Sequence, residues 1–139
     1  MDYTGTSGND VLDQTSLKLV PGSHIYGGVG DDTITTKDGT AHGQAGNDRL
    51  IAQGAWDVAA YWDSPTGITA DLKAGTVQDG FGTTDTLLGF KRIQGSTFND
   101  TMLGTELADS FSSWGGSDYI DGRGGYDYVS FYNTEDRKS

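Results

Sequence analysis

The chain has 139 residues, 22 of them glycine and 34% of them hydrophobic, with a formal net charge of −11 and no cysteine. This length fits one domain with a modest core, and the glycine content indicates many tight turns. The acidic excess disfavours nucleic acid and favours cations as partners, and the lack of cysteine excludes disulfides and zinc–thiolate sites. No apolar run approaches the roughly 18 residues of a transmembrane helix, so no membrane-spanning segment is expected.

The first predicted block, residues 1–54, contains three glycine-rich turn motifs, each followed by a short strand with apolar residues. The motifs are residues 5–10, 27–32 and 43–48. Predicted strand centres are eight or nine residues apart, so two strands and two turns form one coil of about 16 to 18 residues. These centres are Ile25, Ile34, His42, Leu50 and Val58.

The coil length predicts which turns lie above one another. Alternate turns stack on the same edge, so Asp32 and Asp48, which are sixteen residues apart, should share one. Asp10 precedes Asp32 by twenty-two residues, and this longer interval requires a small insertion near residues 19–22.

The predicted spacer, residues 55–92, breaks this pattern and indicates an antiparallel hairpin. Ile68, Ala70 and Leu72 alternate with polar residues, and a turn at residues 73–75 leads to a second strand at residues 76–78. The following loop, residues 79–86, is rich in glycine and aspartate. It is either a solvated loop or a place for an additional cation.

The second block, residues 93–133, keeps a strict nine-residue interval, and a polar tail, residues 134–139, follows it. Ile93, Met102, Phe111, Ile120 and Val129 are the apolar residues of this interval. From Met102 onward an aspartate stands two places earlier, at Asp100, Asp109, Asp118 and Asp127. All four segments are expected to form one folding unit. Because residues 54–62 parallel residues 124–132, we expect the chain to belong to a larger array with neighbouring domains.

This spacing predicts calcium sites. Calcium takes six to eight oxygen ligands, and a glycine-rich turn directs carbonyls inward while its aspartate adds charge. Strand alternation places the apolar residue, two positions later, on the inward side. A single such motif is a common turn, but the regular aspartates and the three further motifs favour metal. The thin core and the repelling carboxylates predict folding that is coupled to binding.

These residues resemble the RTX, or haemolysin-type, calcium-binding repeats of secreted bacterial proteins. The resemblance implies an all-β, right-handed parallel β-roll in two repeat blocks with an inserted hairpin, and several Ca²⁺ ions between successive turns. It also implies folding outside the cell after type I secretion. The aspartate ligands would be Asp10, Asp32, Asp48, Asp100, Asp118 and Asp127, with carbonyls of Gly28, Gly30, Gly46, Gly116 and Gly125; Asp31, Asp57 and Asp109 match less well.

No catalytic motif is present, since the chain lacks HExxH and GxSxG. His24 and His42 stand eighteen apart at stacked strand positions, and a structural role is favoured over catalysis. The predicted function is a non-enzymatic, calcium-dependent folding module of a larger extracellular protein.

An alternative is a calcium-dependent carbohydrate-binding or adhesive module with polysaccharide as partner. Its basis is a set of aromatic residues whose rings either stack on sugars or cover the ends of the roll. Three or more exposed coplanar rings would favour the sugar-binding interpretation. The set comprises Trp56, Trp62, Trp114, Tyr126, Tyr128, Phe131 and Tyr132.

Overall fold

The computed structural model describes residues 2–113 and 118–131, which form fifteen strands. The described residues contain no helix, and therefore none that could span a membrane. The strands are β1 (Asp2–Thr4), β2 (Val11–Asp13), β3 (His24–Tyr26), β4 (Thr33–Thr36), β5 (Thr40–His42), β6 (Arg49–Ala52), β7 (Val58–Ala60), β8 (Thr69–Asp71), β9 (Thr76–Gln78), β10 (Thr84–Leu88), β11 (Arg92–Gln94), β12 (Thr101–Leu103), β13 (Ser110–Ser113), β14 (Tyr119–Asp121) and β15 (Tyr128–Phe131).

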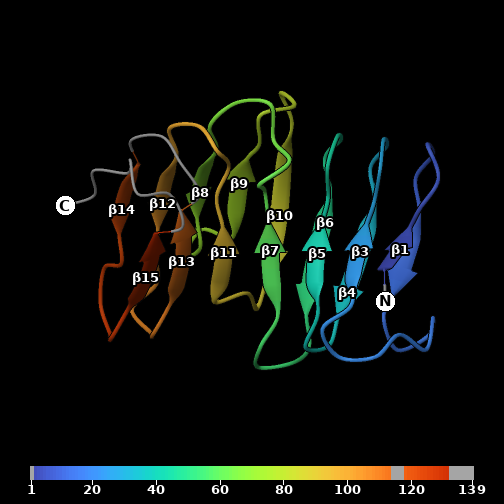
Figure 1. Ribbon diagram of the computed structural model, residues 1–139, viewed down its shortest axis with the longest axis horizontal. Coiled ribbons are helices and arrows are strands. Elements are labelled where there is room, and N and C mark those ends of the chain that lie inside the picture. The colour runs from blue at the N-terminus through green and yellow to red at the C-terminus, as the bar shows by residue number, and fades with distance from the viewer. Residues whose placement is uncertain (1, 114–117, 132–139) are drawn as a thin grey trace.

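Two facing sheets run along the molecule (Figure 1). Sheet A has seven strands in the order β1-β3-β5-β7-β11-β13-β15, and sheet B has eight in the order β14-β12-β8-β9-β10-β6-β4-β2. Outside strands β8 to β10, which all lie in sheet B, the chain passes alternately between the sheets. Equivalent strands of successive coils pair in parallel, as Ile25 with Ala41 and Ile34 with Leu50. This solenoid of about seven turns confirms the predicted parallel β-roll.

The core is a thin ladder of inward side chains between the two sheets. Five residues that stand two places after a motif aspartate are buried, which confirms the predicted register: Leu12, Ile34, Leu50, Met102 and Phe111. The predicted strand centres at His42 and Val58 are each wrong by one residue, because the inward residues that pair at these places are Ala41 and Ala59. Ala41 pairs with Ile25 and points inward, so alternation places His42 on the outer face of sheet A beside Tyr26.

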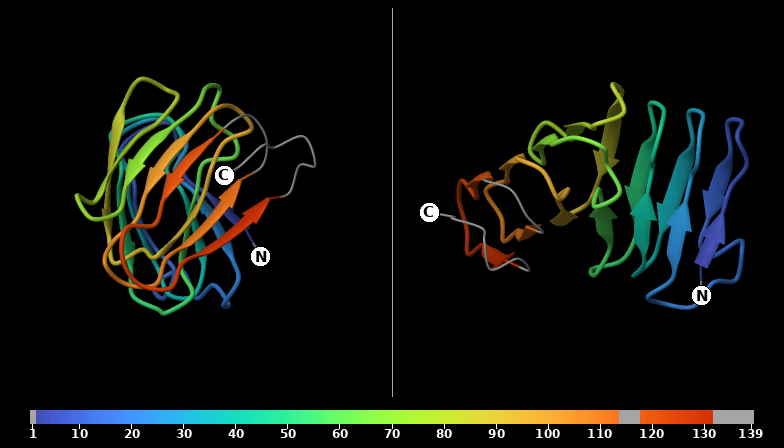
Figure 2. Two further views of the ribbon diagram at one scale, coloured as in Figure 1. Left: turned by 90° about the vertical axis from the view of Figure 1, so that its left-hand side faces the viewer. Right: turned by 45° about the horizontal axis from the view of Figure 1, so that its top comes forward.

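The predicted hairpin lengthens only one of the two sheets. Strand β9 pairs antiparallel with β8 and β10, whereas β10 pairs in parallel with β6 and β8 with β12. Three strands therefore separate β6 from β12 in sheet B, while only β7 separates β5 from β11 in sheet A. At about 4.8 Å per strand, sheet B is longer by roughly 10 Å, so the solenoid bends towards sheet A. Figure 2 shows the coils after the hairpin tilted relative to those before it.

The turns form two rows, one along each edge of the solenoid (Figure 1). Turns that follow strands of sheet A form the first edge, which includes residues 5–10, 27–32, 43–48 and 95–100. Turns that follow strands of sheet B form the second edge, which includes residues 53–57, 104–109 and 122–127. The predicted insertion is confirmed, because ten residues connect β2 to β3 whereas three connect β4 to β5.

Candidate metal centres

Aspartates of the first edge form a ladder that links successive turns. The backbone N–H of Asp10 donates to Oδ1 of Asp32 at 2.8 Å, and the N–H of Asp32 donates to Oδ1 of Asp48 at 2.9 Å. The N–H of Asp48 donates in the same way to Oδ1 of Asp85 at 2.9 Å. The predicted stacking of Asp10, Asp32 and Asp48 on one edge is therefore confirmed.

The ladder resumes after the hairpin. The N–H of Ile68 donates to Oδ1 of Asp100 at 2.9 Å, and the N–H of Asp100 donates to Oδ1 of Asp118 at 2.7 Å. Asp109 and Asp127 lie on the second edge, where the N–H of Asp109 donates to Oδ1 of Asp127 at 2.9 Å. The nine-residue interval thus alternates between the two edges.

Three carboxylates of the first edge each retain an oxygen without a hydrogen-bond donor. These oxygens are Oδ2 of Asp32, Asp48 and Asp100, and all three are buried. A buried carboxylate oxygen without a partner is costly, and a cation would supply the missing charge. Hard carboxylate oxygens are the ligands that calcium prefers, so these three positions fit a calcium ion.

The pKa values of these carboxyl groups indicate the same deficit of positive charge. Burial raises the pKa of Asp100 to about 6 and also raises that of Asp32. Burial, together with the neighbouring charges of Asp85 and Asp32, raises the pKa of Asp48. A bound divalent cation would oppose each of these shifts, because it favours the ionised form.

The first glycine of each motif makes room for the aspartate carboxylate of its own turn. A Cβ atom at Gly27 would lie 2.5 Å from Oδ2 of Asp32, and one at Gly95 would lie 2.5 Å from Oδ2 of Asp100. The carboxylate therefore folds back over the start of its turn. This contact explains on steric grounds why glycine precedes aspartate by five residues.

The predicted carbonyl donors lie where the backbone turns into the left-handed region. Gly28, Gly30, Gly46 and Gly125 have φ values of 89°, 107°, 123° and 77°. This conformation costs glycine little and reverses the direction of successive carbonyls. Their coordination of a metal stays a prediction, and Gly116 lies outside the described residues.

The less regular candidates Asp57 and Asp109 are held by groups of the protein. Asp57 accepts the N–H of Gly39 at 2.9 Å through Oδ1 and the N–H of Gly54 at 2.7 Å through Oδ2. Asp109 accepts the N–H of Thr105 at 2.7 Å and also the hydroxyl of that residue. These contacts fit turn-stabilising aspartates.

Asp31 belongs to a second, outer ladder of the first edge. Its N–H donates to Oδ1 of Asn9 at 2.8 Å, and its Oδ1 accepts the N–H of Asn47 at 2.9 Å. Its side chain is exposed. Oδ1 of Asp31 accepts a backbone N–H of the next turn, as Oδ1 of Asn9 and Oδ1 of Asn47 do in the neighbouring turns. The geometry therefore favours a structural role for Asp31.

Asp85 is a further member of the ladder. The predicted loop, residues 79–86, is wrong at its end, because residues 84–88 form strand β10 and carry Asp85. Oδ2 of Asp85 accepts the hydroxyl of the buried Tyr61 at 2.9 Å, so both of its oxygens are hydrogen-bonded. Burial raises its pKa. A detectable signal existed, because Gly80 precedes it by five residues and the buried Leu87 follows it by two.

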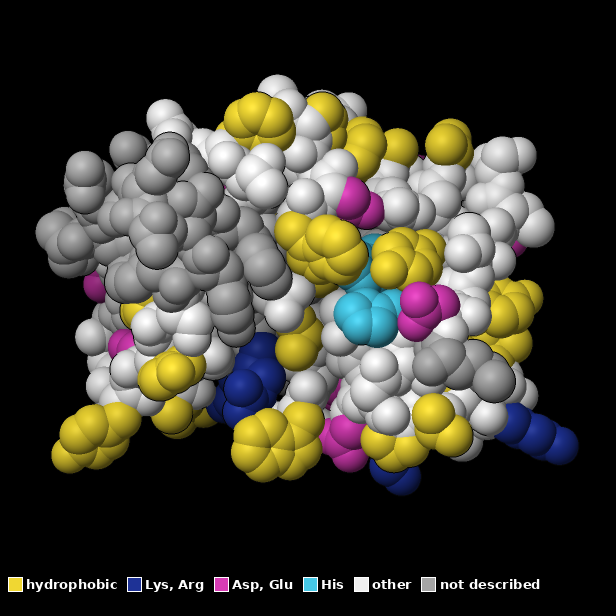
Figure 3. All heavy atoms as spheres, in the orientation of Figure 1, with side chains coloured by type: hydrophobic (Ala, Val, Ile, Leu, Met, Phe, Trp, Pro, Cys, Tyr) yellow, Lys and Arg dark blue, Asp and Glu magenta, His cyan; other side chains and the backbone are white. Residues whose placement is uncertain are grey.

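The two histidines pair on the outer face of sheet A. Nδ1 of His24 lies 2.8 Å from Nε2 of His42, and the His42 ring stacks on Tyr26 with 4.2 Å between centroids. Figure 3 shows histidine side chains among hydrophobic ones on this face. Burial lowers the pKa of His42 to about 3.

This shift predicts that acid destabilises the fold through His42. The folded chain favours the neutral ring of His42. Its contribution to the free energy of unfolding is therefore complete above the unfolded pKa of about 6.5 and is lost as the pH falls towards 3. In this pH window the free energy of unfolding of the unmodified chain should fall by up to about 1.4 kcal/mol per pH unit because of His42. We expect His42→Phe to lack this part of the pH dependence. Urea unfolding of both chains at several pH values between 6.5 and 4.5, with saturating calcium, measures the difference. Parallel pH profiles for the two chains would contradict the assignment.

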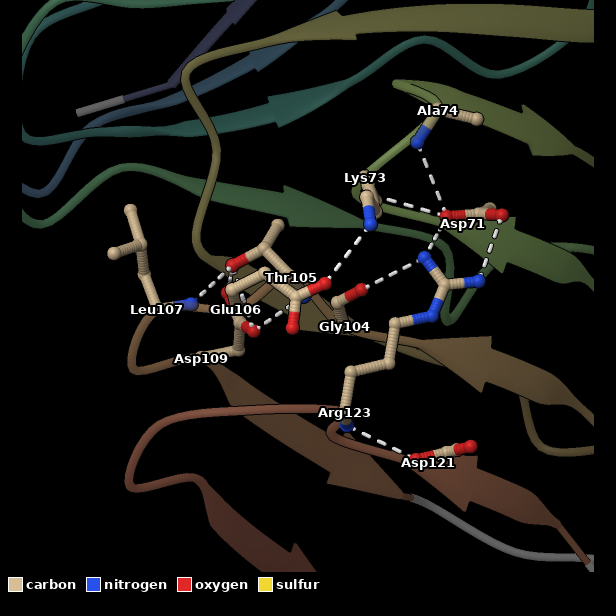
Figure 4. Close-up of polar contacts among 10 residues, drawn as sticks. All are labelled: Asp71, Lys73, Ala74, Gly104, Thr105, Glu106, Leu107, Asp109, Asp121 and Arg123. Atoms are coloured by element: carbon tan, nitrogen blue, oxygen red, sulfur yellow. Dashed lines mark hydrogen bonds and ion pairs between the residues drawn. The ribbon is translucent and has the colours of Figure 1, made fainter.

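One turn of the second edge is tied to the hairpin by an ion pair. Arg123, in the turn that contains Asp127, donates to Oδ1 of Asp71 at 2.8 Å and to Oδ2 at 3.1 Å (Figure 4). Its guanidinium holds the pKa of Asp71 below the usual range. The same guanidinium donates to the carbonyl of Gly104 at 3.1 Å. The hairpin and the last described coils are therefore linked directly.

The RTX calcium-binding nonapeptide repeat profile matches the chain in 4 copies, over residues 23–40, 37–59 and 94–129. No curated protein gives a significant match to the chain. The matched segments contain Asp32 and Asp48 before the hairpin and Asp100 and Asp118 after it, whereas Asp10 and Asp85 lie outside them. Within the described residues no three His, Asp or Glu side chains form a group that could hold a metal ion.

Proposed function

Because the chain belongs to the family of RTX calcium-binding nonapeptide repeats, we propose that it is a structural module that folds around calcium ions. We further propose that it does so outside a bacterial cell, as one part of a larger secreted protein. The observation that supports this function is the set of buried Oδ2 atoms on Asp32, Asp48 and Asp100 that have no donor.

The proposed ligands divide into two groups. Asp32, Asp48 and Asp100 each have an available buried oxygen, and we assign them as the principal side-chain ligands. Asp118 and Asp127 occupy equivalent positions in other turns, and carbonyls of the positive-φ glycines complete the coordination. Asp10 also occupies such a position, but both of its oxygens accept from Thr6, as the carboxylate of Asp109 accepts from Thr105, so it is the weaker candidate. Calcium tolerates such mixed ligand sets because its coordination geometry is flexible.

Calcium would compensate for two weaknesses of this fold. The core is one layer of side chains thick, and stacked carboxylates repel one another. Each ion present at a hundred times its dissociation constant would add about 2.7 kcal/mol to the folded state. Several such ions add up to the stability of a typical small domain.

Circular dichroism during a calcium titration from a chelated start tests the proposal. We expect the β signal to rise cooperatively with calcium and to respond little to magnesium, which demands stricter geometry and retains its water. Isothermal titration calorimetry counts the ions. A chain with the same β signal and melting temperature in chelator as in calcium would refute coupled folding.

A further inference from the structure

The bend of the solenoid leaves a hollow on the outer face of sheet A. A cavity of about 300 Å³ lies beside strands β11, β13 and β15, and a second cavity of about 180 Å³ adjoins it. Arg92, Ser110 and Tyr128 line both cavities, so the two form one continuous groove. The groove lies immediately after the hairpin, where sheet A is the shorter, concave side.

Exposed aromatic rings and two adjacent cations border this groove. Tyr126, Tyr128 and Trp56 are 94%, 67% and 64% exposed. The guanidinium of Arg92 lies 4.5 Å from the centroid of the Trp56 ring, which holds it beside the groove. Lys91 is its sequence neighbour, and among the described residues neither cation forms an ion pair. Asp109 also lines the first cavity, but its side chain is buried and its carboxylate accepts the N–H and the hydroxyl of Thr105. Lys91 and Arg92 therefore carry the more accessible charge at this groove.

The chemistry of the groove favours a sugar over a peptide. Its floor is the outer face of sheet A, which presents side chains and not backbone groups, so an extended peptide cannot add to it as a strand. Among the described strands, β15 ends the sheet, and strand addition there would take place at its far side, away from β13. The hydroxyl and amide groups of Ser110, Ser112 and Gln94 line it instead and match sugar hydroxyls. Exposed tyrosine rings stack on pyranose rings, and an arginine fork binds a carboxylate in bidentate fashion.

We propose that this groove binds an acidic polysaccharide built from uronic acids. Tyr126 and Tyr128 stack on successive sugar rings, and Arg92, positioned by Trp56, binds a sugar carboxylate with Lys91 beside it. Tyr126 and Tyr128 flank Asp127, a proposed calcium ligand, so ordering of this turn by calcium also sets the wall of the groove.

Binding of a tetrasaccharide of galacturonic acid to the full chain in saturating calcium tests the proposal. We expect Arg92→Gln and Tyr128→Ala each to weaken affinity about tenfold in isothermal titration calorimetry. Arg49→Gln and Tyr119→Ala are the matched controls, because both residues are exposed on sheet B, and they should leave affinity unchanged. Circular dichroism in calcium confirms that every variant is folded.

Three probes define the outcomes. Tight binding of the tetragalacturonate with weak binding of neutral maltotetraose and of a tetraglutamate peptide supports the proposal. Equal affinity for maltotetraose would overturn the role of the cations, and equal affinity for tetraglutamate would identify a site for acidic peptides. An absence of tetragalacturonate binding by a calcium-folded chain would overturn the proposal and leave calcium-coupled folding intact.

Discussion

The substitution Asp48→Asn is expected to destabilise the calcium-loaded chain and to stabilise the calcium-free chain. Asparagine keeps a carbonyl oxygen that accepts the N–H of Asp32, but it removes the negative charge. Without calcium that charge is buried beside the carboxylates of Asp32 and Asp85. Burial, together with the charges of these two neighbours, raises the pKa of Asp48. A raised folded pKa means that the ionised form is disfavoured near pH 7, so a neutral side chain improves the calcium-free fold.

The expected change in the free energy of unfolding differs between the calcium-loaded and the calcium-free chain. With calcium, Asp48→Asn removes the anionic ligand of one ion, and loss of that ion costs about 2.7 kcal/mol at a hundredfold excess over its dissociation constant. In chelator the same change should gain on the order of 1 kcal/mol. Asp48→Ala serves as the matched variant, because it also leaves the N–H of Asp32 without an acceptor and costs about 1–3 kcal/mol without calcium.

Urea unfolding of the three chains, in calcium and in chelator, measures both signs. Where a chain does not fold in chelator, the calcium concentration at half-maximal folding reports the same comparison. If Asp48→Asn lost equal stability with and without calcium, Asp48 would act only through the hydrogen-bonded ladder. A calorimetric ion count lower by one in Asp48→Asn would support its role as a ligand.

The regular spacing of the chain predicted the coil, because 16 to 18 residues return the backbone to the same edge. Asp32 and Asp48 were placed together on this basis, and the structure confirms it. Asp85 escaped prediction because thirty-seven residues, including the hairpin, separate it from its neighbour Asp48. Across an insertion of that length, sequence spacing no longer predicts which turns stack on one another. The local pattern of Gly80, Asp85 and Leu87 is still present.

Two further features depend on side-chain orientation, which spacing does not determine. The error of one residue at His42 arose because Ala41 has a weak hydrophobic signal, while Ile25 fixes the register through pairing. The hydrogen bonding of Oδ2 also differs between Asp57 and Asp32. Oδ2 of Asp57 accepts the N–H of Gly54, whereas Oδ2 of Asp32 has no donor. This difference depends on the local course of the backbone, which the sequence spacing does not give.

The one-sided effect of the hairpin has a similar origin. Alternating residues indicated an antiparallel hairpin, but only pairing shows that β10 joins β6 and β8 joins β12. Insertion in sheet B alone bends the solenoid and brings Arg92 and Tyr128 to a concave face. The groove is therefore a product of tertiary structure.

The substitution Gly27→Ala is expected to cost several kcal/mol in calcium and to abolish one calcium site. Its Cβ would lie 2.5 Å from Oδ2 of Asp32 and 2.9 Å from the carbonyl oxygen of Gly43. Neither atom can retreat easily, because the carbonyl belongs to the neighbouring turn and the carboxylate is fixed in the ladder. Overpacking of this kind costs about 1–3 kcal/mol, and loss of an ion adds about 2.7 kcal/mol at a hundredfold excess.

Gly8→Ala is the matched control for this prediction, since it changes the same residue type in the adjacent turn of the same row. A Cβ at Gly8 would meet only the hydroxyl of Thr6 at 3.7 Å, which is ordinary contact, and Gly8 does not have a positive φ. We therefore expect Gly8→Ala to change stability by less than about 0.5 kcal/mol. Calcium-dependent melting and a calorimetric ion count compare the two variants. Equal loss in both would mean that backbone freedom limits the turns, whereas loss in Gly27→Ala alone would show that the glycine is required by the carboxylate folded over it.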